Sequence, residues 1–370
     1  MRILHVSSAR AFGGGERHFA DLTNALARRG HEVFAALVPL SPLRAHLTFL
    51  PAGRLITLPL RNALDLPSAL RLARFARSHQ VEIIHAHLAR DYPLAAYAAR
   101  SSGARLVLTR HVPFALSSIH RLTLANAARV IAVSAPVADR LQAQKIFPAE
   151  IIRVVPNGID LTRFNLAGRA RLRRALPARP GALLVGTVGE LSDVKGQADF
   201  VRAAALVIRQ EGCAHAEFII AGEDRSASRR TRAELDHLID THGLSGRIHL
   251  LGRVEDVATL LGALDVYLSA ARAEAFGLAL AEASACGVPV VATATDGACA
   301  IVENNETGTL VPLRDVGALA HAVASLLRDE ETRARFGTGG RERVRALFSL
   351  ERMVEATEEV YREVTTAAPR

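Results

Sequence analysis

A regular alternation of strand-like and helix-like segments constrains this chain more than any other feature. The first turn of the series is a glycine-rich stretch at 13–16, followed by an amphipathic helical pattern over 17–30 that ends at Gly30. Apolar strand candidates precede and follow them, at residues 1–8, 31–38, 54–60, 81–87, 104–111, 129–134 and 151–158. Helical patterns lie between most of these strands. Such a strand–helix–strand series predicts a doubly wound parallel sheet.

An arginine-rich stretch without a clear pattern interrupts the series at residues 166–180. The alternation then starts again, with strand candidates at residues 182–190, 216–223, 247–253, 265–270, 288–293 and 307–312. The hydrophobic core of a single domain stops growing at about 250–300 residues, so a chain of 370 residues is expected to form two domains. We predict an α/β protein with parallel-sheet domains at 1–165 and 181–345, a linker at 166–180, and a C-terminal helix at 346–370 that packs back toward the first domain. Two such domains would leave a cleft as the default ligand site.

Basic side chains concentrate in the first half of the chain. Residues 1–165 contain 21 Lys and Arg against 9 Asp and Glu, residues 166–370 contain 25 against 28, and the net charge is +9. A basic face attracts nucleic acid, an anionic membrane or an acidic substrate. Because no aromatic interleaving or recognition motif accompanies the charge, we do not expect nucleic-acid binding.

Nothing in the sequence predicts a secretion signal or a membrane span. The apolar start is broken by glycines and charges, and no run of 18 apolar residues occurs. Cys213, Cys286 and Cys299 are odd in number and lack metal-ligand spacing, which favours buried free thiols in a reducing cytoplasm. The histidines are scattered, and even His85 and His87 lack a cluster of partners. We therefore predict no metal site and a cytoplasmic protein.

Two carboxylates stand in an otherwise small and apolar stretch, with seven residues between Glu274 and Glu282. The preceding strand candidate ends near Ala270, and a helix is predicted to begin between Phe276 and Leu278. Glu274 would then lie in a loop at the carboxyl end of a strand, and Glu282 in the second helical turn.

The first turn of that helix suits an anion, because its backbone amides have no helical partners. These amides belong to Gly277, Leu278 and Ala279. A phosphate could lie between the two acids, with Glu282 accepting hydrogen bonds from a ribose diol and Glu274 from a sugar. The alternative is a solvated loop acid and a helix-face acid near a favourable dipole end. The apolar neighbours of Glu282 argue against that alternative, because a buried carboxylate needs partners.

Three further positions follow strand candidates. Lys195 stands where a loop gives way to a helix and could reach a diphosphate, although the Walker order is missing. Gly14 and Gly15 could let a ligand approach the backbone after the first strand, although the nicotinamide-binding spacing is absent. His111 ends a strand, where cleft residues lie. A solvated lysine, a plain glycine turn and a structural histidine remain open alternatives.

Taken in order, these segments resemble family 4 of the retaining glycosyltransferases, which have the GT-B fold of two facing Rossmann-like domains. The resemblance runs nearly end to end. It is carried by GGGERHFADLTNALARRGHEV, VIAVSAPV, VVPNGID and LLGALDVYLSAARAEAFGLALAEASACGVPVVAT, the last with the family's glutamate–x7–glutamate signature. The stretch ARAEAFG is similar to the corresponding stretch in lipopolysaccharide-core enzymes of the family.

The resemblance implies an enzyme that moves a hexose from a nucleoside diphosphate sugar, most simply a UDP-sugar, to a glycan or glycolipid. Glu282 would bind the donor ribose, Glu274 the transferred sugar, and Lys195 the diphosphate. Arg253 would lie near the base, and His111 would face the sugar. The remaining donor contacts would come from Gly14, Gly15, Phe276, Gly277, Leu278 and Ala279. No further cofactor is implied, and the absence of an Asp-x-Asp pair favours phosphate neutralised without a metal ion. The acceptor hydroxyl would attack on the face of the leaving group, with the protein positioning the reactants and stabilising charge.

Two stretches depart from the family pattern. The family commonly has an arginine at the position of Glu190, so Lys195 would bear the diphosphate alone or with another arginine. Asp296 replaces a glycine and Ala300 replaces a glutamate in the stretch that follows the signature. The departures at Glu190 and Ala300 leave open a non-catalytic protein that only binds the sugar nucleotide. A nucleotide-sugar epimerase on the same fold is a separate alternative.

A stripe of arginines marks the basic first half. Arg71, Arg74 and Arg77 recur every three residues, so a helix would present them on one face. The face could simply be solvated, or it could dock on anionic lipid or on a phosphorylated glycolipid at the inner face of the cytoplasmic membrane. We expect a monomer.

Overall fold

The structure, a computed structural model, describes residues 1–112, 114–165, 173 and 176–366. The chain packs into two compact units. Unit 1 comprises Met1–Gly158 and Leu350–Arg370, and unit 2 comprises Ile159–Ser349. The predicted linker at 166–180 falls largely outside the described residues. Its Arg173 is described and lies within unit 2, where its guanidinium pairs with Asp265 at 2.7 Å.

The strands and helices of unit 1 follow one another as the hydrophobic pattern predicts. Its strands are β1 Arg2–Ser7, β2 Glu32–Leu37, β3 Leu55–Thr57, β4 Ile83–Ala86, β5 Arg105–Arg110, β6 Ala127–Ala132 and β7 Ile152–Val154. Its α-helices are α1 Gly14–Arg28, α2 Leu66–Ser78, α3 Tyr92–Ser102, α4 His120–Thr123, α5 Ala135–Ala143 and α14 Leu350–Thr366. Short 3-10 turns occupy Pro42–His46, Ala52–Arg54 and Ala149–Ile151.

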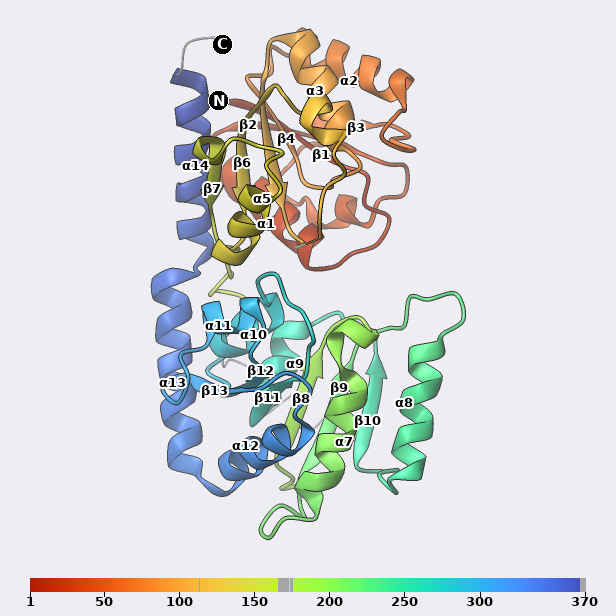
Figure 1. Ribbon diagram of the computed structural model, residues 1–370, viewed down its shortest axis with the longest axis vertical. Helices are drawn as coiled ribbons and strands as arrows, with labels where there is room; N and C mark the ends of the chain where they lie inside the picture. Colours follow the sequence, from red (N-terminus) through yellow and green to blue (C-terminus); the bar gives the residue numbers. More distant parts are fainter. Residues whose placement is uncertain (113, 166–172, 174–175, 367–370) are drawn as a thin grey trace. The chain divides into compact units, whose positions relative to one another are not determined.

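The described strands of unit 1 form one parallel sheet in the order β3-β2-β1-β4-β5-β6-β7 (Figure 1). Alternate residues of each strand point to opposite faces. Ile3, Val33 and Val107 join one core cluster with the apolar sides of α1 and α14. On the opposite face Phe34 meets Phe75 of α2 edge to face, with ring centroids 5.4 Å apart. The sheet is therefore covered on both faces, as parallel sheets require.

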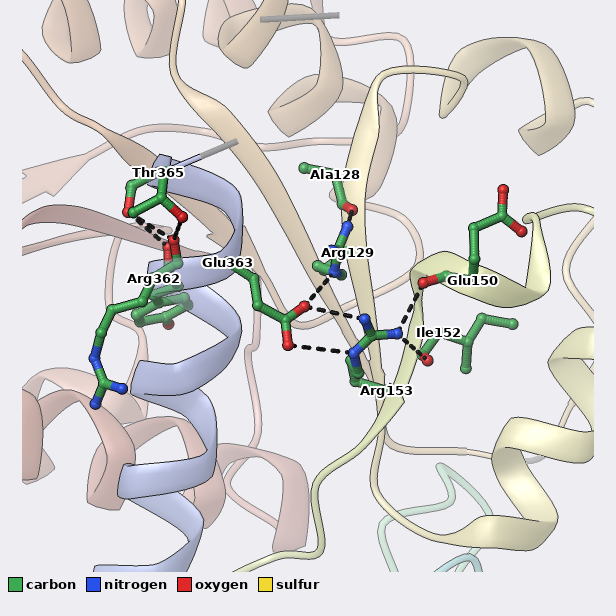
Figure 2. A network of polar contacts seen from close by, with 10 residues as sticks. Ala128, Arg129, Glu150, Ile152, Arg153, Arg362, Glu363 and Thr365 are labelled. Carbon is green, nitrogen blue, oxygen red and sulfur yellow. Dashed lines mark hydrogen bonds and ion pairs between the residues drawn. The ribbon is translucent and has the colours of Figure 1, made fainter. Parts of the chain in front are cut away.

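The helix α14 belongs to unit 1 although it ends the described chain (Figure 1). Its apolar side joins the core through Met353, Val360 and Tyr361. Figure 2 shows its polar anchor: the carboxylate of Glu363 accepts from Arg129 of β6 at 2.8 Å and pairs with Arg153 of β7 at 3.1 Å. The helix α14 therefore helps to cover the sheet of unit 1, whose first strand begins at residue 2.

Unit 2 repeats the strand–helix alternation. Its strands are β8 Leu184–Val188, β9 Glu217–Ala221, β10 Ile248–Gly252, β11 Val266–Ser269, β12 Val290–Thr293 and β13 Gly308–Val311. Its helices are α7 Gln197–Ile208, α8 Arg230–Thr241, α9 Val257–Ala263, α10 Leu278–Ala285, α11 Asp296–Ile301, α12 Val316–Arg328 and α13 Glu330–Leu347, with a 3-10 turn η4 at Asp193–Lys195.

The described strands of unit 2 form a parallel sheet in the order β10-β9-β8-β11-β12-β13. A core cluster joins Phe218, Leu268 and Val291 of the sheet to the apolar sides of α7, α8 and α12. On the other side, α10 packs between α9 and α13. Each unit is thus the Rossmann-like domain that the sequence predicts.

Three details differ from the sequence expectations or refine them. The helix α1 begins at Gly14, so most of the predicted glycine turn at 13–16 belongs to its first turn. Gly30 adopts a left-handed φ of 84° just beyond the helix, as a terminating glycine should. Cys213 and Cys286 are buried free thiols, but Cys299 is exposed, which corrects the expectation that all three are buried. None of the described helices combines the length and hydropathy needed to cross a bilayer.

Candidate active site

The order of strands in unit 2 reverses between β8 and β11. The first strand of the unit, β8, lies beside β11, while β9 and β10 continue on one side and β12 and β13 on the other. In open parallel sheets, ligands bind beyond the carboxyl ends of the strands at such a point, because the loops that follow the two strands diverge there. The loops after β8 and β11 carry Lys195 and Glu274.

The loop that carries Lys195 is fixed against the end of β11. Gly196 follows the lysine with a φ of 68°, and a Cβ at this position would lie 2.0 Å from the carbonyl oxygen of Ala270. Only glycine fits there. From the other side, the amide of Arg272 donates to the carbonyl of Val194 at 2.8 Å. Backbone contacts therefore decide where the lysine side chain projects.

Lys195 and Glu274 meet as an ion pair. The lysine side chain is 34% exposed and the glutamate side chain 15%, so both charges remain partly accessible to solvent. The backbone carbonyl of Glu274 accepts from the amide of Gly297 at 3.0 Å, which ties the loop after β11 to the start of α11. The structure thus brings together two residues that the sequence proposed for neighbouring roles.

The helix α10 begins where the sequence predicts, with Gly277 as its N-cap at a φ of 90°. The first two helical residues are Leu278 and Ala279, so their amides and that of Gly277 stand at the helix N-terminus, which favours an anion. Glu282 lies in the second turn and its residue surface is only 9% exposed. Burial, with Glu282 as a further cause, raises the pKa of the Cys286 thiol to about 12, which places a carboxylate charge close to that thiol.

Tyr267 lies between the two loops. Its hydroxyl donates to the carbonyl of Val188 at the end of β8, at 3.4 Å. Burial is the main reason that its pKa is raised, and both Glu274 and Glu282 raise it further. The charges of both carboxylates therefore act on one buried hydroxyl of β11, the strand whose following loop and helix carry Glu274 and Glu282.

Arg253 and Phe276 are the other predicted donor residues of unit 2, and Glu190 is a position that departs from the family pattern. Arg253 is exposed and follows β10, the edge strand, two strands away from β8. The Phe276 ring is buried against Phe348, with ring centroids 5.5 Å apart, so only its backbone remains for a ligand. Glu190 is exposed and approaches Arg225 to 4.0 Å, which places a guanidinium beside the acid that departs from the family pattern.

Unit 1 has its own reversal of strand order, between β1 and β4. His111 follows β5, the next strand, and its ring lies against α1: a Cβ built on Gly15 would be 3.7 Å from the imidazole Cγ of His111. Gly14 is the first residue of the same helix. The structure therefore brings the glycine pair and His111 to one end of the sheet, as expected for residues that share a site.

Sequence reasoning missed four residues beside His111. His5, His18, His85 and His87 are buried, and with His111 they form what we name the histidine cluster. His5 and His85 occupy the same register on β1 and β4. This corrects the expectation that His85 and His87 lack a cluster of partners. The signal was available, because His5, His87 and His111 all stand near the carboxyl ends of parallel strands.

The members of the histidine cluster are neutral. Burial, helped by the mutual repulsion of the rings, lowers the pKa of His5 to about 3, and burial lowers that of His18 to about 4, with the Asn157 side chain acting in the opposite direction. The pKa values of His85, His87 and His111 are also well below their usual range, with burial as the main cause. Neutral imidazoles can accept a proton or bind a metal ion.

The arginine stripe lies on α2. Arg71, Arg74 and Arg77 are exposed, while Leu72 and Ala76 between them are buried. The guanidinium of Arg77 donates to the carbonyl of Ser101 at the end of α3, which is a favourable place for a cation. One arginine of the stripe therefore has a structural partner, and the other two face solvent.

Comparison with known families covers most of the chain. Residues 12–163 match the model described as Glycosyltransferase Family 4, and residues 168–343 match the model described as Glycosyl transferases group 1. One similar relative is the N-acetyl-alpha-D-glucosaminyl L-malate synthase of Bacillus anthracis, 26% identical over 81% of this chain and 79% of the relative. Another is the lipopolysaccharide core biosynthesis mannosyltransferase of Rhizobium leguminosarum bv. viciae, 32% identical over 56% of this chain and 58% of the relative.

Solved structures give the same result for the fold. Anabaena HepE in complex with UDP and glucose superposes with a TM-score of 0.86, at 21% identity, over 98% of this chain and 100% of that one. Sucrose-phosphate synthase from Thermosynechococcus elongatus superposes with a TM-score of 0.79, at 25% identity, over 99% of both chains. The two family models and the solved structures lead to the same assignment, and this chain belongs to glycosyltransferase family 4 and has the GT-B fold.

Proposed function

We propose that this glycosyltransferase moves a hexose, with retention of configuration, from a UDP-sugar to a glycan or glycolipid. The observation that carries the proposal is the ion pair of Lys195 with Glu274 at the junction of β8 and β11, followed in the chain by the N-terminus of α10, whose second turn carries the buried Glu282. A lysine, a helix N-terminus and two carboxylates are the groups that a diphosphate with a sugar at each end requires. A solved neighbour that contains UDP and UDP-glucose supports this choice of donor.

Each residue has a separate role in the proposed site. The diphosphate lies at the amides of Gly277, Leu278 and Ala279, and Lys195 neutralises the charge that develops on the leaving phosphate. Glu282 accepts from the ribose hydroxyls and Glu274 from the transferred sugar. With lysine and helix amides on the phosphates, no metal ion or further cofactor is needed there. Arg253 is proposed beside the base, and the backbone of Phe276 beside the phosphates.

In unit 1, His111 is proposed to face the transferred sugar, and Gly14 and Gly15 to line the junction of donor and acceptor. His111 offers a neutral imidazole, and the glycine pair keeps the backbone of α1 close to it. The acceptor hydroxyl attacks on the face that the phosphate leaves, so the leaving phosphate can take its proton. Positioning of the two substrates supplies most of the rate in such a scheme.

The acceptor is proposed to be a glycolipid that the protein meets at the inner face of the cytoplasmic membrane, as a monomer. The exposed Arg71 and Arg74 supply the positive charge for anionic lipid, and a lipopolysaccharide-core mannosyltransferase among the relatives supports this acceptor class. Sedimentation with anionic vesicles at low salt tests the docking. Wild-type protein should sediment, and Arg71→Gln/Arg74→Gln should sediment less; a wild type that stays in the supernatant contradicts the proposal.

Thermal shifts with nucleotides test the donor site directly. UDP, GDP, ADP and their sugars are compared on wild type and Glu282→Ala. A ligand at about 100 times its dissociation constant adds roughly 2.7 kcal/mol of stability, which moves the midpoint by several degrees. A shift with UDP that the variant loses supports the proposal. No shift with any nucleotide would favour the non-catalytic alternative, and turnover without acceptor would favour the epimerase.

A further inference from the structure

The histidine cluster divides into two parts by its hydrogen bonds. In the inner part, both nitrogens of His85 are within hydrogen-bond distance of hydroxyls, Nδ1 at 2.6 Å from Tyr361 and Nε2 at 2.7 Å from Thr109. His5 Nδ1 lies 3.0 Å from His87 Nε2. These contacts tie His85 of β4 to β5 and α14, and His5 of β1 to His87. Each inner ring therefore has a partner in the fold, although Nε2 of His5 has none among the described residues.

The outer part lacks such partners. His87 Nδ1 and both ring nitrogens of His18 and His111 are buried and have no hydrogen-bond partner among the described residues. Asn157 lies near His18 without reaching hydrogen-bond geometry. A buried polar atom left without a partner destabilises the fold, because it has lost its hydrogen bonds to water. Three adjacent rings have nitrogens without a hydrogen-bond partner, so one shared ligand could satisfy all three. A ligand that binds three imidazoles at once is a metal ion.

We propose that His18, His87 and His111 form a binding site for a divalent transition-metal ion, with Zn²⁺ as the ion of choice. One ligand nitrogen from each ring lies within 4.8 Å of the others. In a tetrahedral site with Zn–N bonds of about 2.0–2.1 Å the nitrogens stand about 3.3 Å apart, so the rings need only small side-chain rotations. Three histidines leave the fourth position for water or substrate.

The surroundings suit such a site. Metal-binding histidines usually bond their second nitrogen to a neighbouring group, and His5 does this for His87 at 3.0 Å. All three rings are neutral because burial lowers their pKa values, so protons compete little with the metal. Imidazole ligands select Zn²⁺, Cu²⁺ or Ni²⁺ over Mg²⁺ and Ca²⁺, which prefer oxygen. The histidines of this site belong to unit 1, whereas the residues proposed for the diphosphate belong to unit 2.

An ion at this site would change the reaction proposed above, and this consequence rests on the proposed function. His111 is assigned to the transferred sugar, and a ring that binds Zn²⁺ no longer offers its nitrogen to the sugar. Zn²⁺ is therefore expected to inhibit transfer, while removal of metal by EDTA leaves transfer intact. Because metal binding is measured without donor or acceptor, a failure of the proposed function would not affect the test of the site.

The test is calorimetric titration of metal-free, untagged protein with Zn²⁺, compared with His18→Leu. The leucine removes one ligand and places an apolar group where two ring nitrogens had no partner, so the fold should be as stable as before or more so. His321→Gln, an exposed histidine of unit 2, is the matched control. Wild type and H321Q should bind one ion tightly, and H18L should bind at least tenfold more weakly. Equal affinity in all three proteins would overturn the proposal.

A second measurement on the wild type does not depend on any variant. Co²⁺ bound by three imidazoles and one further ligand is tetrahedral and absorbs strongly in the visible range, whereas Co²⁺ at exposed side chains is octahedral and absorbs weakly. An intense visible band that Zn²⁺ abolishes at one equivalent is the expected result. A weak band, or no band, would mean that the outer histidines are satisfied by water alone, and the metal site would be wrong.

Discussion

Lys195 and Glu274 form an ion pair at the junction of β8 and β11, although 79 positions separate them in the sequence. In the proposed reaction a bound diphosphate shares the lysine with this carboxylate. Lys195→Ala removes the cation that stabilises the leaving phosphate, and we expect kcat to fall by about 10²- to 10³-fold. Steady-state kinetics with UDP-sugar and acceptor measure the effect.

Lys145→Ala is the matched control, because Lys145 is the only other lysine of the chain and is exposed in unit 1. It should leave kcat unchanged. If the two variants behave alike, the lysine after β8 does not stabilise the leaving group.

The buried carboxylate of Glu282 is predicted to act mainly on donor binding. Hydrogen bonds to a charged group contribute about 1.5–3 kcal/mol, so Glu282→Ala should weaken UDP binding roughly 10- to 100-fold, with a smaller effect on kcat at saturating donor. Calorimetric titration with UDP measures the change. Glu234→Ala, on the exposed side of α8, should bind UDP as wild type does. A kcat effect without a change in affinity would move Glu282 from binding to chemistry.

Glu190 places a negative charge in a loop that leads to Lys195, at the position where the family commonly has an arginine. Its carboxylate is about half exposed, and only Arg225 approaches it among the described residues, at 4.0 Å. Glu190→Gln removes repulsion with the diphosphate, and UDP should bind about two- to fivefold more tightly at low ionic strength. The gain should shrink in 0.5 M salt. Weaker binding in the variant would show that the carboxylate itself contacts the donor.

The neutral histidine cluster predicts acid sensitivity of unit 1. The pKa of His18 is about 4 in the folded protein, below the ordinary value of 6.5, so the unfolded chain takes up the proton first. The stability that the neutral His18 contributes is complete above about pH 6.5 and is lost as the pH falls toward 4. Its upper limit is on the order of 3 kcal/mol. Urea unfolding in EDTA, between pH 7.5 and 4.5, measures it.

His18→Leu removes this titrating group, so its free energy of unfolding should fall less over the same pH range. Exposed His321→Gln should follow the wild-type curve. Parallel curves for all three proteins would mean that the pKa of His18 is not lowered in the folded state.

Tyr361 fixes α14 to the sheet through a buried hydrogen bond. Tyr361→Phe leaves Nδ1 of His85 without its partner, and we expect a loss of about 1–3 kcal/mol and a lower midpoint of thermal unfolding. Glu363→Gln breaks the pairs with Arg129 and Arg153 seen in Figure 2, but these side chains are partly exposed, so the loss should be only about 0–1 kcal/mol. A larger effect from the glutamate than from the tyrosine would reverse this ranking.

Local pattern accounts for much of what the sequence predicted. The strand and helix periods placed the two sheets, Gly30 placed the end of α1, and the spacing of Glu274 and Glu282 placed one acid in a loop and the other in the second turn of α10. These features depend on residues close in sequence, whose effect on the backbone does not require knowledge of distant contacts. The local pattern was misinterpreted as a turn at residues 13–16, because glycines that suit a turn also fit the first turn of a helix.

The sequence by itself determined the two Rossmann-like sheets and the loops that carry the donor-site residues. Only the tertiary structure decided which of those side chains meet: Lys195 with Glu274, Glu190 with Arg225, and His18 with His87 and His111. The physical reason is the parallel sheet, which gathers the carboxyl ends of its strands at one edge. Side chains that lie tens of residues apart in the chain come into contact there. Their burial, their charge state and their hydrogen-bond partners depend on these contacts and not on the local sequence pattern.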